Sequence, residues 1–131
     1  MAPAATPPAL VLGCTGTVTK VPTVRVTMAG SVAGPTGQVA NTGTGFVLSN
    51  GTVSAPAAFI FATLDGHIEA WNPMVDALIG PAENKATVPG AGYTGLAIAS
   101  TRRGDRLLAA NFAQGRIDVF NSGFGKVRTA H

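Results

Sequence analysis

Short apolar runs alternate with Gly, Pro and Asn along most of the chain. Runs of this kind, rich in β-branched and aromatic residues and bounded by turn formers, are typical of β-strands. The clearest examples lie at 59–73 and 107–121, where each stretch is predicted to form two strands joined by a glycine-centred turn, at Gly66 and Gly115. The pattern therefore predicts an all-β chain.

These two stretches match each other position for position, and a second matched phrase, at 34–40 and 92–98, precedes each of them. A weaker third copy begins at Gly16, which makes the spacing about 50 residues, within the range of propeller-type repeats. We therefore interpret the chain as a repeat protein. The matched pairs are Gly66 with Gly115, Ile68 with Ile117, Glu69 with Asp118, Trp71 with Phe120 and Asn72 with Asn121.

The repeat predicts both a fold class and a domain layout. The fold class is a partial β-propeller of about two and a half four-stranded antiparallel blades. A flexible lead-in at 1–8 is expected to precede the propeller portion at 9–131. This portion comprises a blade 1 remnant at 9–28, blade 2 at 34–80 with a hairpin insertion at 41–58, and blade 3 at 92–131.

Several strand assignments follow from this layout. The remnant is expected to hold three short strands, at 9–12, 17–19 and 24–28. The run 76–80 is expected to form the outer strand of blade 2, because the repeat period favours a strand there, and 81–92 is expected to form a loop. The segment 126–128 is the candidate for the last strand.

The insertion at 41–58 is predicted to form a protruding β-hairpin. Asn50-Gly51 follows an apolar run, and both central residues of a type I′ hairpin turn need positive φ, which Asn and Gly tolerate. The same residues form an N-glycosylation sequon with Thr52. The turn accounts for them without a modification, so glycosylation at Asn50 is left as the alternative.

Composition narrows the function classes. Charged residues make up 11% of the chain and the net charge is +3. Nucleic-acid binding usually shows as clustered basic residues on one face, whereas the only cluster here, Arg102, Arg103 and Arg106, is interrupted by Asp105. We interpret it as a solvated loop and expect no nucleic-acid partner. Cys14 is the single cysteine, so no intrachain disulfide can form, and no apolar run is long enough to span a membrane.

Candidate chemistry rests on Asp65, Glu69 and Asp118. Glu69 and Asp118 occupy matched positions, which favours a structural role, and alternation along a strand allows His67 to pair with Glu69 and Arg116 with Asp118. Asp65 precedes a glycine and is interpreted as a turn residue. We therefore assign no catalytic, cofactor-binding or metal-ligating residue. His67 and His131 lack metal-ligand spacing, Gly43-Thr44-Gly45 is a poor dinucleotide fingerprint, and no nucleophile-elbow motif occurs.

Both faces of the paired strands carry apolar bulk. Ile68 and Ile117 lie on one face, and Trp71 and Phe120, which could also stack on a sugar or a base, lie on the other. Such a sheet must be covered on both faces, and stacked propeller blades cover one another. A propeller closes with about four blades or more, so the present blades are expected to leave two faces open. The partners expected are the remaining blades of a longer chain, or self-association.

The phrases at 34–39, 59–73, 95–98, 109–112 and 115–120 resemble an uncharacterised family of secreted bacterial β-propeller proteins with six-bladed-like repeats. The resemblance implies a portion of a longer propeller, an extracytoplasmic or secreted location, and a non-catalytic binding or scaffolding module of unknown ligand. The alternative is a portion of a metal-dependent, lactonase-like six-bladed hydrolase. No cofactor is predicted, and a divalent metal is expected only in a complete propeller, because the inner phrases at 36–40 and 94–99 contain no Asp, Glu, Asn or His to bind one.

Overall fold

The computed structural model describes residues 8–9, 24–25, 35–76 and 80–130. Within these ranges the regular structure is β-sheet with one short 3-10 helix, so the all-β prediction is confirmed. The strands are β1 (Pro8–Ala9), β2 (Val24–Arg25), β3 (Pro35–Ala40), β4 (Val47–Ser49), β5 (Ser54–Pro56), β6 (Phe59–Thr63), β7 (His67–Trp71), β8 (Gly80–Pro81), β9 (Glu83–Thr87), β10 (Tyr93–Thr101), β11 (Gly104–Asn111), β12 (Arg116–Phe120) and β13 (Lys126–Ala130), and the 3-10 helix is η1 (Phe112–Gln114).

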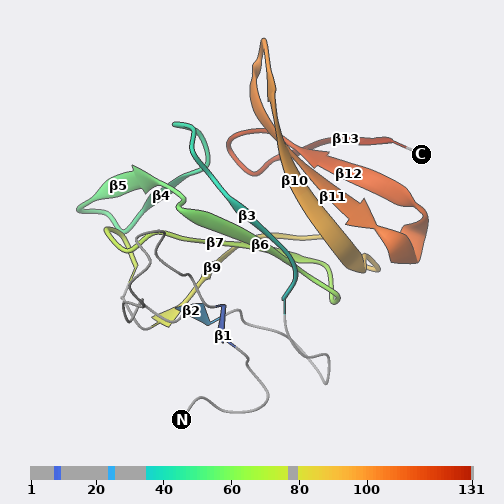
Figure 1. Ribbon diagram of the computed structural model, residues 1–131, viewed down its shortest axis with the longest axis horizontal. Helices are drawn as coiled ribbons and strands as arrows, with labels where there is room; N and C mark the ends of the chain where they lie inside the picture. The colour runs from blue at the N-terminus through green and yellow to red at the C-terminus, as the bar shows by residue number, and fades with distance from the viewer. Residues whose placement is uncertain (1–7, 10–23, 26–34, 77–79, 131) are drawn as a thin grey trace, which may run out of the picture.

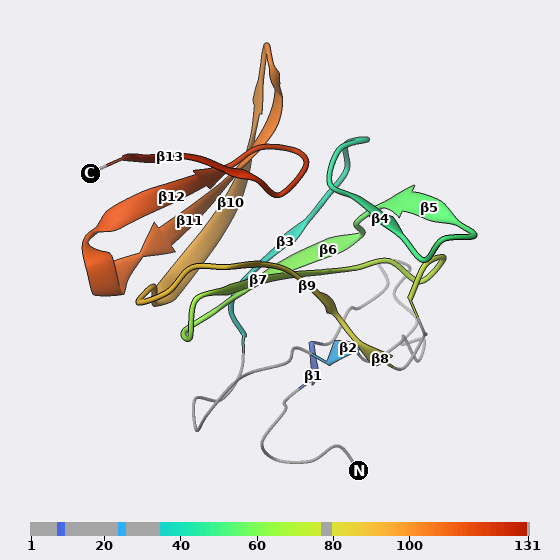
Figure 2. The ribbon, with the colours of Figure 1, turned by 180° about the vertical axis from the view of Figure 1, so that it is seen from behind.

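Two four-stranded antiparallel sheets dominate the fold (Figure 1). The first sheet has the order β3-β6-β7-β9 and the second has the order β10-β11-β12-β13. In each sheet, neighbouring strands follow one another along the chain, except that β4, β5 and β8, which belong to other sheets, are passed over in the first. The two sheets stand side by side, and β10 lies against β3 and β6 in both views (Figures 1 and 2). A β4-β5 hairpin and a small β1-β2-β8 sheet lie beside the first sheet.

Strand register is the same in the inner parts of the two sheets. In each, a glycine on the first strand of the sheet, β3 or β10, which we call the innermost strand, faces an alanine on the second strand. That alanine faces an isoleucine on the third strand. Directly before each glycine a threonine has no partner in the ladder, so the register shifts there. The corresponding sets are Thr36, Gly37, Ala62 and Ile68 in the first sheet and Thr94, Gly95, Ala110 and Ile117 in the second.

The two hairpin turns differ in length, however. In the first sheet β6 returns through Gly66, whose φ is +87°, and in the second β11 returns through η1 and Gly115, whose φ is +63°. Positive φ is easily reached only by glycine, which explains both turn residues. The second turn is one residue longer, so Ile60 of the first sheet occupies the place of Leu108. The pairs named from the sequence, which differ by 49 residues as Gly66 and Gly115 do, therefore hold after the turn. Before the turn the difference is 48 residues, which aligns the starts of the two stretches at 59 and 107.

A shared core fills the space between the two sheets. The first sheet contributes Ile60, Ala62, Ile68 and Ala70, all fully buried. The second contributes residues that occur in alternation on its strands, as expected for one face of a pleated sheet. These are Tyr93, Leu107, Ala109 and Phe120. On its opposite face the first sheet buries Phe61 and Trp71 in a smaller cluster with Ala82.

The outer strand of the first sheet is β9, which pairs with β7, and not the expected run 76–80. After β7 the chain closes a compact turn instead: Asn72 Oδ1 accepts from the amide of Met74, and Asp76 Oδ2 accepts from the amide of Asn72. These side-chain bonds compete with strand pairing. The predicted loop at 81–92 is wrong over β9, so the first sheet extends beyond the predicted boundary at 80. The last strand at 126–128 is confirmed within β13.

The insertion 41–58 contains the predicted hairpin, formed by β4 and β5. Its turn is not type I′, because Gly51 has positive φ and Asn50 does not. Asn50 Oδ1 instead accepts from the amides of Thr52 and Val53, which closes the turn through the side chain. Nor does the hairpin simply protrude, since one of its faces joins the shared core. The core residues of the insertion are Phe46, Leu48, Ala55 and Ala57.

Several predictions fall outside the described residues. These include most of the blade 1 remnant, Cys14, the weak repeat copy at Gly16 and His131. Val24–Arg25 is the described part of the expected strand at 24–28. Among the described residues, no helix is both long and apolar enough to cross a membrane.

Candidate functional site

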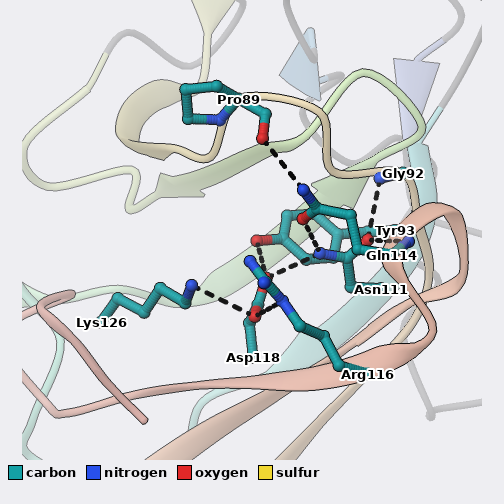
Figure 3. Close-up of polar contacts among 8 residues, drawn as sticks. All are labelled: Pro89, Gly92, Tyr93, Asn111, Gln114, Arg116, Asp118 and Lys126. Carbon is teal, nitrogen blue, oxygen red and sulfur yellow. Dashed lines mark hydrogen bonds and ion pairs between the residues drawn. The ribbon is translucent and has the colours of Figure 1, made fainter. Parts of the chain in front are cut away.

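The first candidate site is a buried carboxylate on β12. Asp118 has no exposed surface, yet four donors surround it (Figure 3). Tyr93 Oη and Asn111 Nδ2 donate to Oδ2 over 2.9 and 3.0 Å. Arg116 Nε and Lys126 Nζ lie 2.9 and 3.4 Å from Oδ1. Two positive charges and two neutral donors thus offset the cost of burying one negative charge.

The network also joins two loops. Asn111 Oδ1 accepts from the amides of Gly92 and Gln114, each over 3.2 Å. Gln114 Oε1 accepts from Asn111 Nδ2 over 2.7 Å, and Gln114 Nε2 donates to the carbonyl of Pro89 over 3.4 Å. The Asp118 network therefore ties the β9–β10 connection to the β11–β12 turn (Figure 3).

Two pKa shifts follow from this arrangement. Burial alone would raise the pKa of Asp118, but the hydrogen bonds from Tyr93 and Asn111 and the charges of Lys126 and Arg116 outweigh burial and lower it. Burial, the bond to Asp118 and its charge raise the pKa of Tyr93 far above the ordinary value. At neutral pH the network therefore holds an ionised carboxylate and a neutral phenol. All four donors are engaged, so the network serves to join elements of the fold.

The structure places the other sequence candidates in turns and cores. The predicted Arg116–Asp118 pair is confirmed. Asp65 lies in the β6–β7 turn, where its carboxylate accepts from the Thr63 hydroxyl and lies 3.8 Å from His67 Nδ1. Glu69 is fully buried on the third strand, as Asp118 is.

The aromatic candidates and the sequon also have structural partners. Trp71 and Phe120 are buried in the two apolar clusters, which confirms packing as their role. Asn50 Nδ2 donates to the carbonyl of Val75 over 3.1 Å, which ties the hairpin turn to the 72–76 turn. Within the part of the chain that the structure describes, no three His, Cys, Asp or Glu side chains converge as a metal site would require.

The second candidate site is the outer face of the second sheet, the face turned away from the shared core. Ile117 is 41% exposed and Val127 is 48% exposed, whereas Leu108 and Ala110 are half-buried. The equivalent residues of the first sheet, including Ile60 and Ile68, are fully buried. We call this surface the open face and define it by Leu108, Ala110, Ile117, Val119 and Val127, of which Val119 is buried, with 7% of its surface exposed.

Shallow depressions run along the open face. One lies beside Thr94 and Ile117, a second beside Gly95 and Leu108. A third, the largest of these three at about 690 Å³, lies where the open face meets the β10–β11 hairpin. Its walls are apolar on the sheet side and basic on the hairpin side. The residues lining it are Ala99, Thr101, Arg102, Arg103, Arg106, Leu108, Val119 and Val127.

One of the two uncovered apolar faces expected from the sequence is found, on the second sheet. The other was expected on the blade 1 remnant, most of which lies outside the described residues. The outer face of the first sheet buries Phe61 and Trp71. Sequence reasoning did not distinguish the face of Ile68, which is buried, from the face of Ile117, which is exposed, because the two are identical residues at matched positions. It also treated Arg102 and Arg103 as a loop only. They are exposed in the β10–β11 hairpin as expected, but they also border the open face.

The innermost strands β3 and β10 also differ in whether another strand lies next to them. The Thr36 hydroxyl donates to the carbonyl of Ala62, over 3.2 Å, and to that of Tyr93 in the neighbouring sheet. A Cβ on Gly37 would lie 2.9 Å from the Cβ of Leu96. At the equivalent glycine, Gly95, the nearest atom to such a Cβ is in its own sheet, at 3.7 Å. β10 thus lies next to β3, but within the described residues no strand lies next to β10 in the same way.

Comparison with known proteins shows a viral relative. No family model matches the chain, and no solved structure matches it. The chain is similar to a mimivirus protein, the "Uncharacterized protein R648" of Acanthamoeba polyphaga mimivirus, with 32% identity over 95 residues. The match covers 71% of this chain but 23% of the viral protein. The chain therefore spans about a quarter of the length of this relative.

Proposed function

We propose that the chain is a non-catalytic scaffolding module, in which the two four-stranded sheets are successive blade-like units of a repeat. A further unit of the same kind packs on the open face. The observation that carries the proposal is the equivalence between the two sheets: the face that the first sheet buries against the second is the face that the second leaves open.

Stacking in one direction explains this equivalence. Ile60, Ala62, Ile68 and Ala70 of the first sheet pack against the opposite face of the second sheet, which carries Leu107 and Phe120. Units that repeat this contact present the same two faces to each neighbour. A terminal unit then keeps one face without a partner, and the residues at the corresponding places there are Leu108, Ala110, Ile117 and Val119.

The innermost strands support the same arrangement. Gly37 allows the close approach of β10, and the Thr36 hydroxyl bonds to it. Thr94 and Gly95 occur at the same register in β10, but Thr94 is exposed and Gly95 has room for a side chain. With a further innermost strand beside β10, Thr94 would bond to that strand as Thr36 bonds to β10, and Gly95 would allow its close approach as Gly37 does.

The relative and the family resemblance extend the proposal. The viral protein is long enough to hold several further units of this size, because the chain covers 23% of it. From the resemblance at 34–39, 59–73 and 115–120 we infer a propeller as the whole assembly and an extracytoplasmic location. The partners in this assembly are the remaining blades.

The test extends the full chain at its C-terminus with a second copy of residues 88–130. The appended segment starts with the same connection that leads from β9 to β10, so it can continue the stack. Nile red, a neutral dye that fluoresces on apolar surfaces, reports the open face. The appended copy carries Leu108→Ser, Ile117→Ser and Val127→Ser, so that its own open face, which no further unit covers, does not bind the dye. We expect strong dye fluorescence with the chain alone and a loss of most of it with the extended chain.

A matched control carries Phe120→Asp in the second copy. This residue is fully buried between the sheets in its original place, and a charge there would prevent docking. We expect the control to keep the dye fluorescence of the chain alone. If the extended chain without this substitution also keeps it, one-directional stacking is wrong.

A further inference from the structure

We propose that Arg102, Arg103 and Arg106 bind a carboxylate of the next stacked unit, at the position that Asp105 occupies in the second sheet. This inference rests on the proposed function and adds the chemistry of the partner at one end of the open face. The three side chains border the depression of about 690 Å³, whose apolar wall includes Leu108 and Val119.

The arginines are available for an anion. Arg102 and Arg103 are exposed, and within the described part of the chain none of the three forms an ion pair with a carboxylate. Arg106 Nη1 donates to the backbone carbonyls of Arg103 and Asp105, over 3.4 and 3.2 Å. These two bonds hold its guanidinium against the hairpin, which leaves other N–H donors for an external acceptor, since a guanidinium has five.

The observed contact between the two sheets indicates what lies opposite this position. The β3–β6 connection of the first sheet lies against the β12–β13 connection, where Phe46 donates its amide to the carbonyl of Ser122 over 2.7 Å. Ser122 lies beside Gly104 at the start of β11, because a Cβ on Gly104 would lie 3.8 Å from Ser122 Oγ. In the same place Gly43 faces Asp105 so closely that a Cβ there would lie 2.4 Å from Asp105 Oδ2. The connection between the first two strands of one sheet therefore faces Asp105 of the next.

If units stack in one direction, the same contact recurs between the second sheet and the unit that follows it. The connection between the first two strands of the second sheet is the β10–β11 hairpin, which carries Arg102 and Arg103. In the next unit, the residue that would face this hairpin is the one at the position of Asp105. A carboxylate there would meet three arginines instead of a glycine, and arginine binds carboxylates with charge-assisted, often bidentate bonds.

Two other partner classes fit less well. Nucleic acid that binds through single strands uses aromatic side chains for base stacking, and no aromatic residue lines this depression. A second copy of the chain placed face to face would bring the same arginines into the interface without a carboxylate from the open face to offset them. A stacked unit with a carboxylate at the position of Asp105 would cover the apolar wall of the depression and pair with the arginines of its basic wall.

The test is a double-mutant cycle in the extended chain described above, with Arg103→Glu in the first copy and Asp105→Arg in the second copy. Urea unfolding is measured for the parent, both single variants and the double variant. We expect each single reversal to lower the unfolding midpoint and the double reversal to recover part of the loss. The expected coupling is about twofold to fivefold in the unfolding constant, as for exposed ion pairs, and it should fall in high salt.

Lys85→Glu in the first copy serves as the matched control, because it changes the charge equally, lies on β9 and contacts Phe124 instead. It should show no coupling with the second-copy Asp105→Arg. If the dye shows the open face covered but the Arg103 cycle is additive, the carboxylate contact is wrong while stacking stands. If the face stays open in the extended chain, both proposals are wrong.

Discussion

The two sheets share their strand order and inner register but differ in what covers them. The first sheet, β3-β6-β7-β9, is buried on both faces, whereas the second, β10-β11-β12-β13, is buried on one. Matched isoleucines show the difference most clearly, because Ile68 is fully buried and Ile117 is 41% exposed. Local sequence thus determines the strands and their pairing, while the neighbouring sheet determines whether an apolar face becomes a core.

Substitution of the matched isoleucines should give the largest contrast. We expect Ile68→Ala to lower the free energy of unfolding by about 2–5 kcal/mol, because it leaves a cavity in the shared core. Ile117→Ala should cost only about 0.5 kcal/mol, the usual size for a surface change. Urea unfolding of both variants measures the difference. Equal losses would mean that the open face is covered in the folded chain.

Removal of the buried charge should have the next largest effect. Asp118→Asn leaves donors of the Asp118 network unpaired, and we expect a loss of about 1.5–3 kcal/mol at neutral pH. The pKa of Asp118 is lower in the folded chain than its ordinary value of 3.8. Its stabilisation is therefore complete above that value and is lost as the pH falls through the lowered pKa.

Acid unfolding curves check this prediction. The loss of stability below pH 3.8 should be smaller in Asp118→Asn than in the parent, because the variant has no carboxylate at this position to protonate. Ile117→Ala, which leaves every carboxylate in place, should keep the acid response of the parent. An unchanged response in Asp118→Asn would rule out the network as its source.

The paired glycines sharpen the comparison on the innermost strands. Gly37→Ala would place a Cβ 2.9 Å from Leu96 Cβ and 3.1 Å from its amide nitrogen, and overpacking of this kind costs about 1–3 kcal/mol. Gly95→Ala meets only ordinary contact and should be neutral or slightly stabilising, since alanine restricts the unfolded chain. Thermal unfolding of the two variants gives the comparison. A destabilising Gly95→Ala would show that β10 already has a close neighbour.

The smallest effect is expected from the paired threonines. Thr36→Val removes the hydroxyl that bonds to the carbonyls of Ala62 and Tyr93, at a cost of about 0.5–1.5 kcal/mol. Thr94→Val should cost less, because Thr94 is exposed in the open depression. In the extended chain the first-copy Thr94→Val should acquire the cost of Thr36→Val. If the cost of Thr94→Val is the same with and without the second copy, Thr94 does not take the role of Thr36.

Much of the strand pattern was predictable because it is local. Strands β6, β7, β11 and β12 carry dense apolar residues next to glycine turns. The edge strand β9 was missed, since its Glu83-Asn84-Lys85 run reads as a loop; an edge strand pairs on one side only and tolerates such polarity. The turn type at Asn50 was missed because the side chain of Asn50, and not its backbone, closes the turn.

The candidate sites were only partly predictable. The Arg116–Asp118 pair could be read from a spacing of two along a strand, but Tyr93 and Asn111 reach Asp118 from other strands, so their contacts depend on register. The covering of the two sheets could not be read at all from Ile68 and Ile117, whose local contexts match. Burial of a sheet face is a property of the neighbour, which lies far away in the sequence.

Thiol labelling tests the central claim, the equivalence of a buried and an open face, most directly. In a chain that carries Cys14→Ser, single cysteines replace the equivalent residues Ala62 and Ala110. We predict slow labelling at position 62, because Ala62 is fully buried, and fast labelling at position 110. Extension with a second copy of residues 88–130 should slow the first-copy position 110 to the rate of position 62. Equal rates at the two positions before extension would contradict the account.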